Sequence, residues 1–223
     1  MAKVYLSPSD QESNVYAYDN TNEAVQCGRI AEACRAALER SGVEVKVGHM
    51  ISMAQKCSES NAFGADLHVP IHTNAFNGKV MGTRMFCYSA GSKGMAACKA
   101  IFARLAPITP GESENIQVNS DYYEVRVPAA PTAYIECEFH DTVEGAKWIV
   151  ENTVLIGETI ARGICDYFGV KFVEKPKPVE PEKKDVLYRV QIGAYKIKAN
   201  AEKRQAEAKA AGFTDAFIVT VEQ

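Results

Sequence analysis

The chain has 223 residues, which is enough for one domain of ordinary size and a small addition. Hydrophobic residues make up 47% of it and charged residues 24%, the composition of a globular protein. The net charge of −3 argues against a nucleic-acid partner, and no apolar stretch is long enough to span a membrane. No N-terminal signal segment is recognisable, so we expect synthesis in the cytoplasm without a signal peptide.

The seven cysteines fit a reducing compartment better than a disulfide framework. They are odd in number and scattered, and no two of them form a Cys-x-x-Cys pair. We therefore expect most of them to be small buried residues. Cys137 stands next to a glutamate, but no histidine accompanies it in a recognisable catalytic arrangement, which makes a cysteine nucleophile a weak alternative.

The amino-terminal part of the chain alternates between strand and helix patterns. Apolar or small residues recur with helical spacing between residues 22 and 40, and Ser41-Gly42 closes that segment. The expected elements, in chain order, are a strand at 2–6, a helix at 22–40, a strand at 43–47, a helix at 51–63, a strand at 66–72, a strand at 82–88 and a helix at 92–105.

The alternation continues beyond a polar loop at 107–121. The pattern predicts a strand near 123–127, a further strand that contains Glu136, and a helix from about Val143 to Tyr167 with a break near Asn152. Strands that alternate with helices predict an α/β fold with a mostly parallel, twisted sheet and helices on both faces.

The composition changes sharply near residue 172. Residues 173–185 are rich in proline, lysine and glutamate and contain almost nothing to bury, which is typical of a linker. Beyond this segment, strand patterns at 187–192 and 216–221 flank a helix pattern at 200–211 and predict a small βαβ-like unit. The expected division of the chain is a domain at 1–171, a linker at 172–186 and a small module at 187–223.

Two side chains at the ends of apolar strands are the first candidates for chemistry. His72 ends the strand at 66–72, at the sheet edge where α/β enzymes usually place their sites. Glu136 stands among apolar residues, where a carboxylate is costly unless it is paired, bound to a metal or used as a proton carrier. Together they indicate metal-assisted hydrolysis.

Other polar residues have both structural and functional interpretations. Glu23 lies at a helix start, either in a capping box with Asn20 or as a metal ligand. His68 lies about 13 Å from His72 along one strand, so both cannot bind one ion, and we expect His68 to pack in the core. Glu138 shares a strand face with Glu136 and could reach the same site.

With these residues in this order, residues 2–169 resemble the zinc-dependent N-acetylmuramoyl-L-alanine amidases of bacterial autolysins and phage endolysins. The matching motifs are the helix-start Glu23, His72-Thr73-Asn74-Ala75, and Glu136-Cys137-Glu138-Phe139. The resemblance implies that Glu23 and His72 hold Zn²⁺ and that Glu136 is the catalytic base and acid. Asn74, Arg126 and Glu138 are expected to contact the substrate.

The chain departs from the family pattern at one ligand. Where the family has its first histidine, this chain reads Leu6-Ser7-Pro8-Ser9-Asp10-Gln11, so Asp10, Gln11 or a water would complete the zinc site. Asp10 is chemically the better ligand because zinc binds carboxylate oxygens readily and amides rarely. A Ser-Pro-Ser-x-Gln motif is similar to a subgroup of endolysin-like amidases, which favours an active enzyme.

The carboxyl-terminal segment resembles the first half of a SPOR peptidoglycan-binding repeat. The similar residues are Tyr-Arg-Val-Gln-Ile-Gly-Ala-Tyr from Tyr188 and Lys-Ala-Asn-Ala-Glu from Lys198. A unit of about 35 residues buries little core by itself. We therefore expect it to pair with its copy in a second chain, as a homodimer, or to dock on the first domain.

The resemblance implies hydrolysis of the amide bond between N-acetylmuramic acid and L-alanine of the stem peptide, with Zn²⁺ as cofactor and peptidoglycan as partner. No nucleic acid or membrane partner is expected. The implied site of action is the cell wall, reached after release as in a phage lysin. The alternatives are a non-catalytic wall-binding protein on the same fold and a related zinc peptidase.

Overall fold

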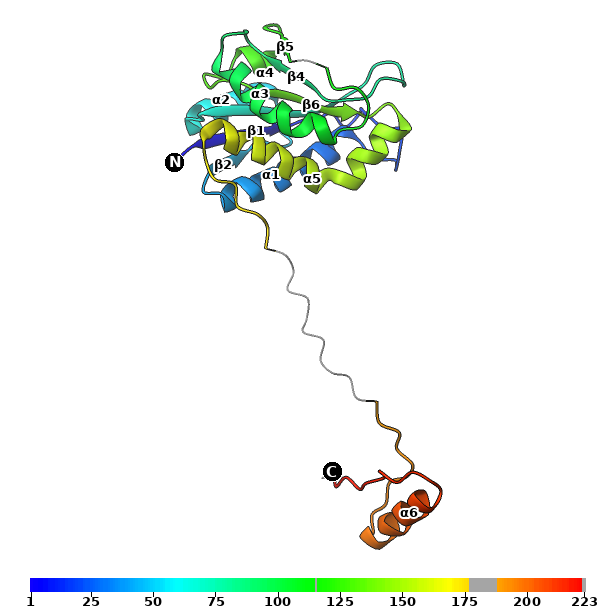
Figure 1. The fold of residues 1–223 in the computed structure, drawn as a ribbon. Coiled ribbons are helices and arrows are strands. Elements are labelled where there is room, and N and C mark those ends of the chain that lie inside the picture. Colours follow the sequence, from blue (N-terminus) through cyan, green and yellow to red (C-terminus); the bar gives the residue numbers. More distant parts are fainter. Residues whose placement is uncertain (115, 177–187, 222–223) are drawn as a thin grey trace. The chain divides into compact units, whose positions relative to one another are not determined.

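The structure is a computed structural model that describes residues 1–114, 116–176 and 188–221. The chain forms two compact units, Met1–Pro176 and Lys177–Gln223 (Figure 1). The predicted linker at 172–186 lies largely outside the described residues. No helix in the described ranges is long and apolar enough to cross a bilayer.

The first unit is built on a six-stranded sheet in the order β2-β1-β3-β6-β4-β5. The strands are β1 (Lys3–Pro8), β2 (Glu44–Val47), β3 (Leu67–Asn74), β4 (Arg84–Cys87), β5 (Gln117–Val118) and β6 (Tyr134–Phe139). All neighbouring strands are parallel except β4 and β6, which are antiparallel. The prediction of a mostly parallel α/β sheet is confirmed.

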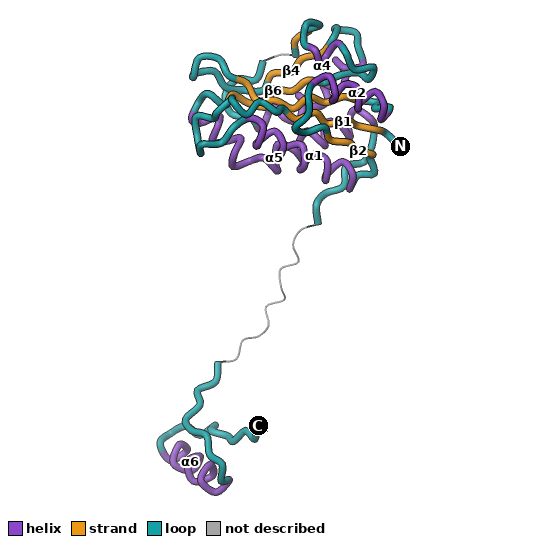
Figure 2. Tube along the Cα trace, turned by 180° about the vertical axis from the view of Figure 1, so that it is seen from behind, coloured by secondary structure: helices purple, strands orange, loops and turns teal. Residues whose placement is uncertain are grey.

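Helices cover both faces of this sheet (Figure 2). On one face, α5 (Val143–Phe168) packs between α1 (Glu23–Arg40) and α3 (Lys93–Leu105). On the other face, α2 (Met53–Phe63) contacts α4 (Tyr123–Arg126). The central strand β3 is buried between the two layers over seven of its eight residues, as expected for an inner parallel strand.

Local sequence signals explain where the helices begin, end and bend. Asn22 caps α1, and its side chain accepts a hydrogen bond from the Val25 N–H, so the capping residue is Asn22 and not the predicted Asn20. Ser52 and Gln55 form a capping box at the start of α2. Asn152 has non-helical dihedral angles within α5, which confirms the predicted break.

Two predicted elements of the first unit are different in the structure. Residues 123–127 were expected as a strand, but Tyr123–Arg126 form the short helix α4. The alternation of polar and apolar residues there is too short to separate the two periods. The expected polar loop at 107–121 contains the two-residue strand β5 at the sheet edge.

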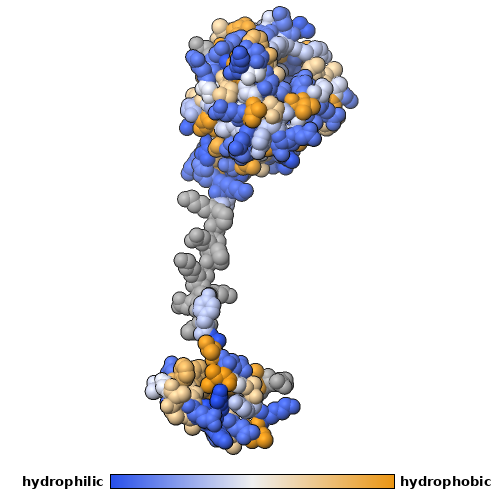
Figure 3. All heavy atoms as spheres, turned by 90° about the vertical axis from the view of Figure 1, so that its right-hand side faces the viewer, coloured by the Kyte–Doolittle hydropathy of each residue, from blue (hydrophilic) through white to orange (hydrophobic). Residues whose placement is uncertain are grey.

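The second unit contains the helix α6 (Lys198–Ala210), which overlaps the predicted segment 200–211 but begins two residues earlier. The predicted strands do not form over 188–192 or 216–221, where the backbone has no strand partner among the described residues. Apolar side chains lie at the surface of this unit (Figure 3). The most exposed are Tyr188, Val190, Phe213, Phe217 and Val221.

Candidate active site

His72 and Glu23 meet at the carboxyl edge of the sheet. His72 lies near the end of β3, while Glu23 is the first residue of α1. Nδ1 of His72 is 3.0 Å from Oε1 of Glu23, and both side chains are buried. Two residues that are 49 positions apart therefore present a nitrogen and an oxygen to one point.

Gln11 is the third side chain at this point. It follows β1, and its amide nitrogen lies 3.4 Å from Nδ1 of His72. Asn14 links the group, because its side-chain amide donates to Glu23 at 2.6 Å and to the Gln11 oxygen at 3.2 Å. Since a half-turn of an amide exchanges its oxygen and nitrogen, Gln11 can present either atom to this site.

Glu136 faces the same site from the neighbouring strand. It is paired with His72 in the register between β3 and β6. Within the described part of the chain, Oε2 of Glu136 and Nε2 of His72 are buried and have no hydrogen-bond partner. Buried polar atoms normally have one, so these two atoms indicate that the site accepts a further polar group.

The electrostatics of the site follow from burial and from these contacts. Burial raises the pKa of Glu136 to about 7, although the nearby His72 acts to lower it. Burial acts to lower the pKa of His72, but the bond to Glu23 and the charge of Glu136 raise it overall. For Glu23, the bonds from His72 and Asn14 outweigh burial and lower the pKa.

Asp10, the other predicted ligand, points elsewhere. Its carboxylate accepts hydrogen bonds from the backbone N–H groups of Met50 and Ile51, at 2.7 and 3.2 Å. The same carboxylate lies 2.7 Å from Nζ of the buried Lys56, which also donates to the carbonyl of Pro8. The structure therefore brings Gln11, and not Asp10, to His72.

The residues predicted to contact substrate occupy three different environments. Glu138 is fully buried, and its carboxylate accepts hydrogen bonds from the backbone N–H groups of Gly82 and Phe139. Asn74 ends β3, and its side chain accepts a bond from the Ala75 N–H. Arg126 is exposed at the end of α4. The Glu138 carboxylate is thus bound to backbone N–H groups, whereas Asn74 is partly exposed and Arg126 is exposed to solvent.

His68 is buried in the core, as expected. Its Nε2 lies 3.2 Å from Oε1 of Glu124 on α4, and the hydroxyl of Ser7 donates to the same oxygen. The thiol of Cys57 completes a group of potential metal ligands whose atoms lie within 4.8 Å of one another. Nε2 of His68 already bonds to Glu124 inside the core, while Nδ1 of His68 has no partner among the described residues. The bonds of Glu124 to His68 and Ser7 indicate a hydrogen-bonded anchor for α4.

Aromatic residues beside His72 were missed by sequence reasoning. The ring of Tyr134 stacks on the His72 ring with the centroids 4.7 Å apart, and Tyr122 contacts Tyr134 at 5.1 Å. Tyr134 precedes Glu136 by two residues and so shares its strand face, which was a usable signal. Tyr122 comes from a loop, and nothing in the sequence pattern places it there.

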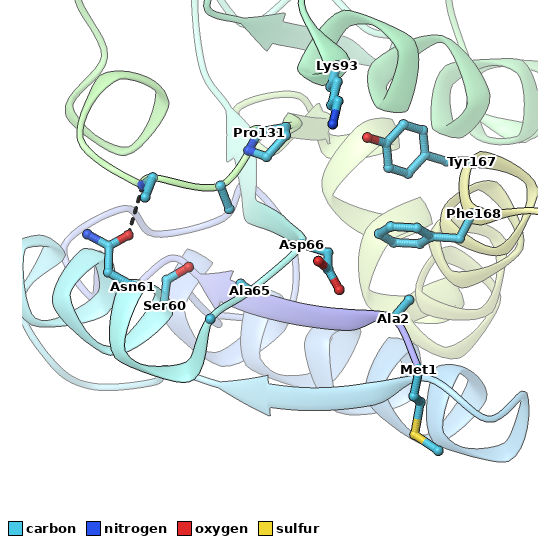
Figure 4. Close-up of a pocket in the computed structure, with 13 residues that line it drawn as sticks. Met1, Ala2, Ser60, Asn61, Ala65, Asp66, Lys93, Pro131, Tyr167 and Phe168 are labelled. Atoms are coloured by element: carbon cyan, nitrogen blue, oxygen red, sulfur yellow. Dashed lines mark hydrogen bonds between the residues drawn. The ribbon is translucent and has the colours of Figure 1, made fainter.

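A separate cavity of about 540 Å³ lies at the opposite edge of the sheet (Figure 4). The cavity is lined by residues that precede β1 and β3, such as Ala2 and Asp66, and by Tyr167 and Phe168 at the end of α5. His72, Glu23 and Glu136 lie at the other edge and do not line it. This cavity is therefore not the site described above.

The family profile for N-acetylmuramoyl-L-alanine amidases matches residues 9–166, a range that includes Gln11, Glu23, His72 and Glu136. The chain belongs to this amidase family. A second profile, for the SPOR domain, matches residues 171–222. Both resemblances predicted from the sequence are thereby confirmed.

Curated relatives of this amidase cover nearly the whole chain. A sporulation-specific N-acetylmuramoyl-L-alanine amidase of Bacillus subtilis (strain 168) is 26% identical over 227 residues, which is 98% of this chain and 85% of the relative. The N-acetylmuramoyl-L-alanine amidase CwlM of Bacillus licheniformis is 25% identical over 226 residues, with the same two coverages.

A solved amidase structure confirms the fold of the first unit. The catalytic domain of the amidase CwlV from Bacillus (Paenibacillus) polymyxa var. colistinus superposes with a TM-score of 0.68 at 17% identity. The match covers 77% of this chain and all of that domain. At this identity the likeness supports the α/β architecture of the amidase.

Proposed function

We propose that this amidase, which hydrolyses the bond between N-acetylmuramic acid and L-alanine in peptidoglycan, works with a Zn²⁺ ion held by Glu23, His72 and Gln11. One observation carries the proposal. The side chains of Glu23 and Gln11 converge on Nδ1 of His72, and a buried oxygen of Glu136 beside them has no partner among the described residues.

The donor set suits this ion. Imidazole nitrogen and carboxylate oxygen are common zinc ligands, and the amide oxygen of Gln11 is a weaker third donor. The separation of 3.0 Å between Nδ1 of His72 and Oε1 of Glu23 is close to that of two ligands on one zinc ion. When bound, Zn²⁺ would acidify a water molecule and polarise the scissile carbonyl.

Glu136 is the proton carrier in this proposal. Because its pKa of about 7 is close to neutral pH, the carboxylate can take a proton from water and then give it to the leaving amide nitrogen. Burial excludes solvent around the carboxylate and keeps that pKa high. Beside Glu136, the contact with Glu23 orients His72, and the hydrogen bond from Asn14 orients Gln11.

Gln11→Ala is expected to affect zinc binding, and Asp10→Ala is expected to affect the stability of the fold. Removal of the Gln11 amide takes away a ligand and should weaken Zn²⁺ binding about tenfold, measured by competition with a chelator. Removal of the Asp10 carboxylate should leave the zinc affinity within about twofold and lower the stability, because Lys56 loses its partner. The reverse result would make Asp10 the ligand.

A non-catalytic wall-binding protein is the second candidate, and the missing family histidine favours it. Stem peptides released from purified cell wall, with the release abolished by a chelator, would support the enzyme. Tight wall binding without release would support the binding protein. Cleavage of peptides that lack the sugar would instead indicate a zinc peptidase.

The second unit is proposed to bind peptidoglycan through its SPOR sequence and to associate with a second copy. Its apolar side chains are exposed, and the segments 188–192 and 216–221 have strand-forming sequences but pair with no strand in the described part of the unit. Two copies could pair these segments and bury the apolar face. We expect light scattering to give a dimer and Phe217→Asp to give a monomer; a monomeric parent chain would contradict this.

A further inference from the structure

An aromatic wall, which we define as Phe86, Tyr122 and Tyr134, lines one side of the candidate active site. Phe86 on β4 is opposite Tyr134 on β6 in the antiparallel register. The ring of Tyr122 lies 5.1 Å from each of the other two rings. Since Tyr134 also stacks on His72, the wall is continuous with the ligand residues.

Tyr122 is the accessible member of this wall. Phe86 is buried and Tyr134 is half-buried, whereas Tyr122 is 36% exposed. Burial and the charge of Glu136 raise the pKa of the Tyr122 phenol, which agrees with a position beside the catalytic carboxylate. The exposed part of this ring therefore borders the place where the substrate meets Glu136.

The position of Tyr122 is fixed by the helix that follows it. Its carbonyl accepts hydrogen bonds from the N–H groups of Val125 and Arg126, at 3.1 and 3.0 Å, in the first turn of α4. In the same turn, the buried Glu124 is bound to His68 and to Ser7. The ring is thus presented from an anchored turn, and little ordering is needed when a ligand packs on it.

We propose that Tyr122 binds the sugar of the substrate, with its ring packed against the pyranose ring of N-acetylmuramic acid. This inference rests on the proposed function. The wall offers ring faces and phenol hydroxyls but no charged side chain, which suits the uncharged, amphipathic ring of a sugar better than the charged groups of a stem peptide. Tyr122 is then a determinant of substrate recognition, while Glu136 carries the chemistry.

The test compares Tyr122→Ala with Tyr122→Phe on two substrates, an N-acetylmuramoyl-peptide and the corresponding lactoyl-peptide without the pyranose ring. For the muramoyl substrate, Tyr122→Ala should raise KM about tenfold and leave kcat within about twofold, since one ring contact is lost. Tyr122→Phe should stay within about twofold of the parent. For the lactoyl substrate, all three proteins should have similar KM values.

Tyr88→Ala is the matched control. Tyr88 is an exposed tyrosine that follows β4, and because β4 runs antiparallel to β6 it lies toward the opposite sheet edge. It should not change either KM. An unchanged KM in Tyr122→Ala, or an equal loss on both substrates, would overturn the proposal.

A binding measurement separates this inference from the proposed function. If the parent protein cleaves neither substrate, the proposed function fails, but titration with the methyl glycoside of N-acetylmuramic acid amide, whose lactyl carboxyl is neutral as in the substrate, still reports on the wall. Weaker binding by Tyr122→Ala than by the parent and by Tyr88→Ala would support the sugar site. Equal binding, or none by any of the three proteins, would reject it.

Discussion

Glu136→Gln is expected to lower kcat about a thousandfold while the zinc content and the folded state persist. The amide keeps the size and polarity of the side chain but cannot take a proton from water and pass it to the leaving nitrogen. Its carboxylate is buried beside His72, and one of its oxygens has no partner among the described residues and is free to accept the proton. The measurement is the release of stem peptide from purified peptidoglycan.

Glu138→Gln is the control on the same strand. The irregular pairing of β3 and β6 breaks the expected alternation between Glu136 and Glu138, and Glu138 lies next to Gly145 of α5. The Glu138 carboxylate accepts backbone hydrogen bonds from Gly82 and Phe139, so its loss should lower the stability but change kcat by less than about tenfold. If Glu136→Gln kept the activity of the parent, Glu136 would not be the base. If both variants lost activity equally, a structural effect would explain the result.

Glu124→Ala is expected to destabilise the protein by about 3 kcal/mol at neutral pH, because it breaks a buried pair and leaves His68 and Ser7 without their acceptor. Burial acts to raise the pKa of Glu124, but the bonds from His68 and Ser7 lower it overall. The stabilisation is therefore present above the ordinary pKa of 4.5 and is lost as the pH falls through the lower, folded-state pKa.

The measurement is urea unfolding followed by the fluorescence of Trp148, the single tryptophan. The difference between parent and Glu124→Ala should be largest at neutral pH and should shrink below about pH 4. Glu39→Ala removes an exposed partner of Arg35 and should cost less than about 1 kcal/mol. A Glu124→Ala effect as small as that of Glu39→Ala would show that the buried pair does not anchor α4.

The sequence predicted the strand-end residues well because hydrophobic runs are strong signals. His72 and Glu136 follow or interrupt apolar strands, and the structure places them in register. The two competing explanations for Glu23 could not be separated from the sequence, since Asn20 and Asn22 are both good caps. The contact with His72 across 49 residues decides the orientation of Glu23.

Features that depend on distant partners were not predictable. Tyr123–Arg126 alternate like a strand, but the buried bonds of Glu124 to His68 and Ser7 hold this segment as a helical turn. The antiparallel direction of β4 also leaves no periodic signal. Asp10 looked like the better ligand on chemistry alone, and the partners that hold its carboxylate, Lys56 and the N–H groups of Met50 and Ile51, are distant in the sequence.

The pair of Asp10 and Lys56 makes two positions of the sequence mutationally interdependent. A neutral side chain placed at position 10 would deprive the buried ammonium group of Lys56 of its counterion. A neutral side chain at position 56 would have to accompany it. Each substitution alone is expected to be destabilising and the two together tolerated, so positions 10 and 56 are expected to change together.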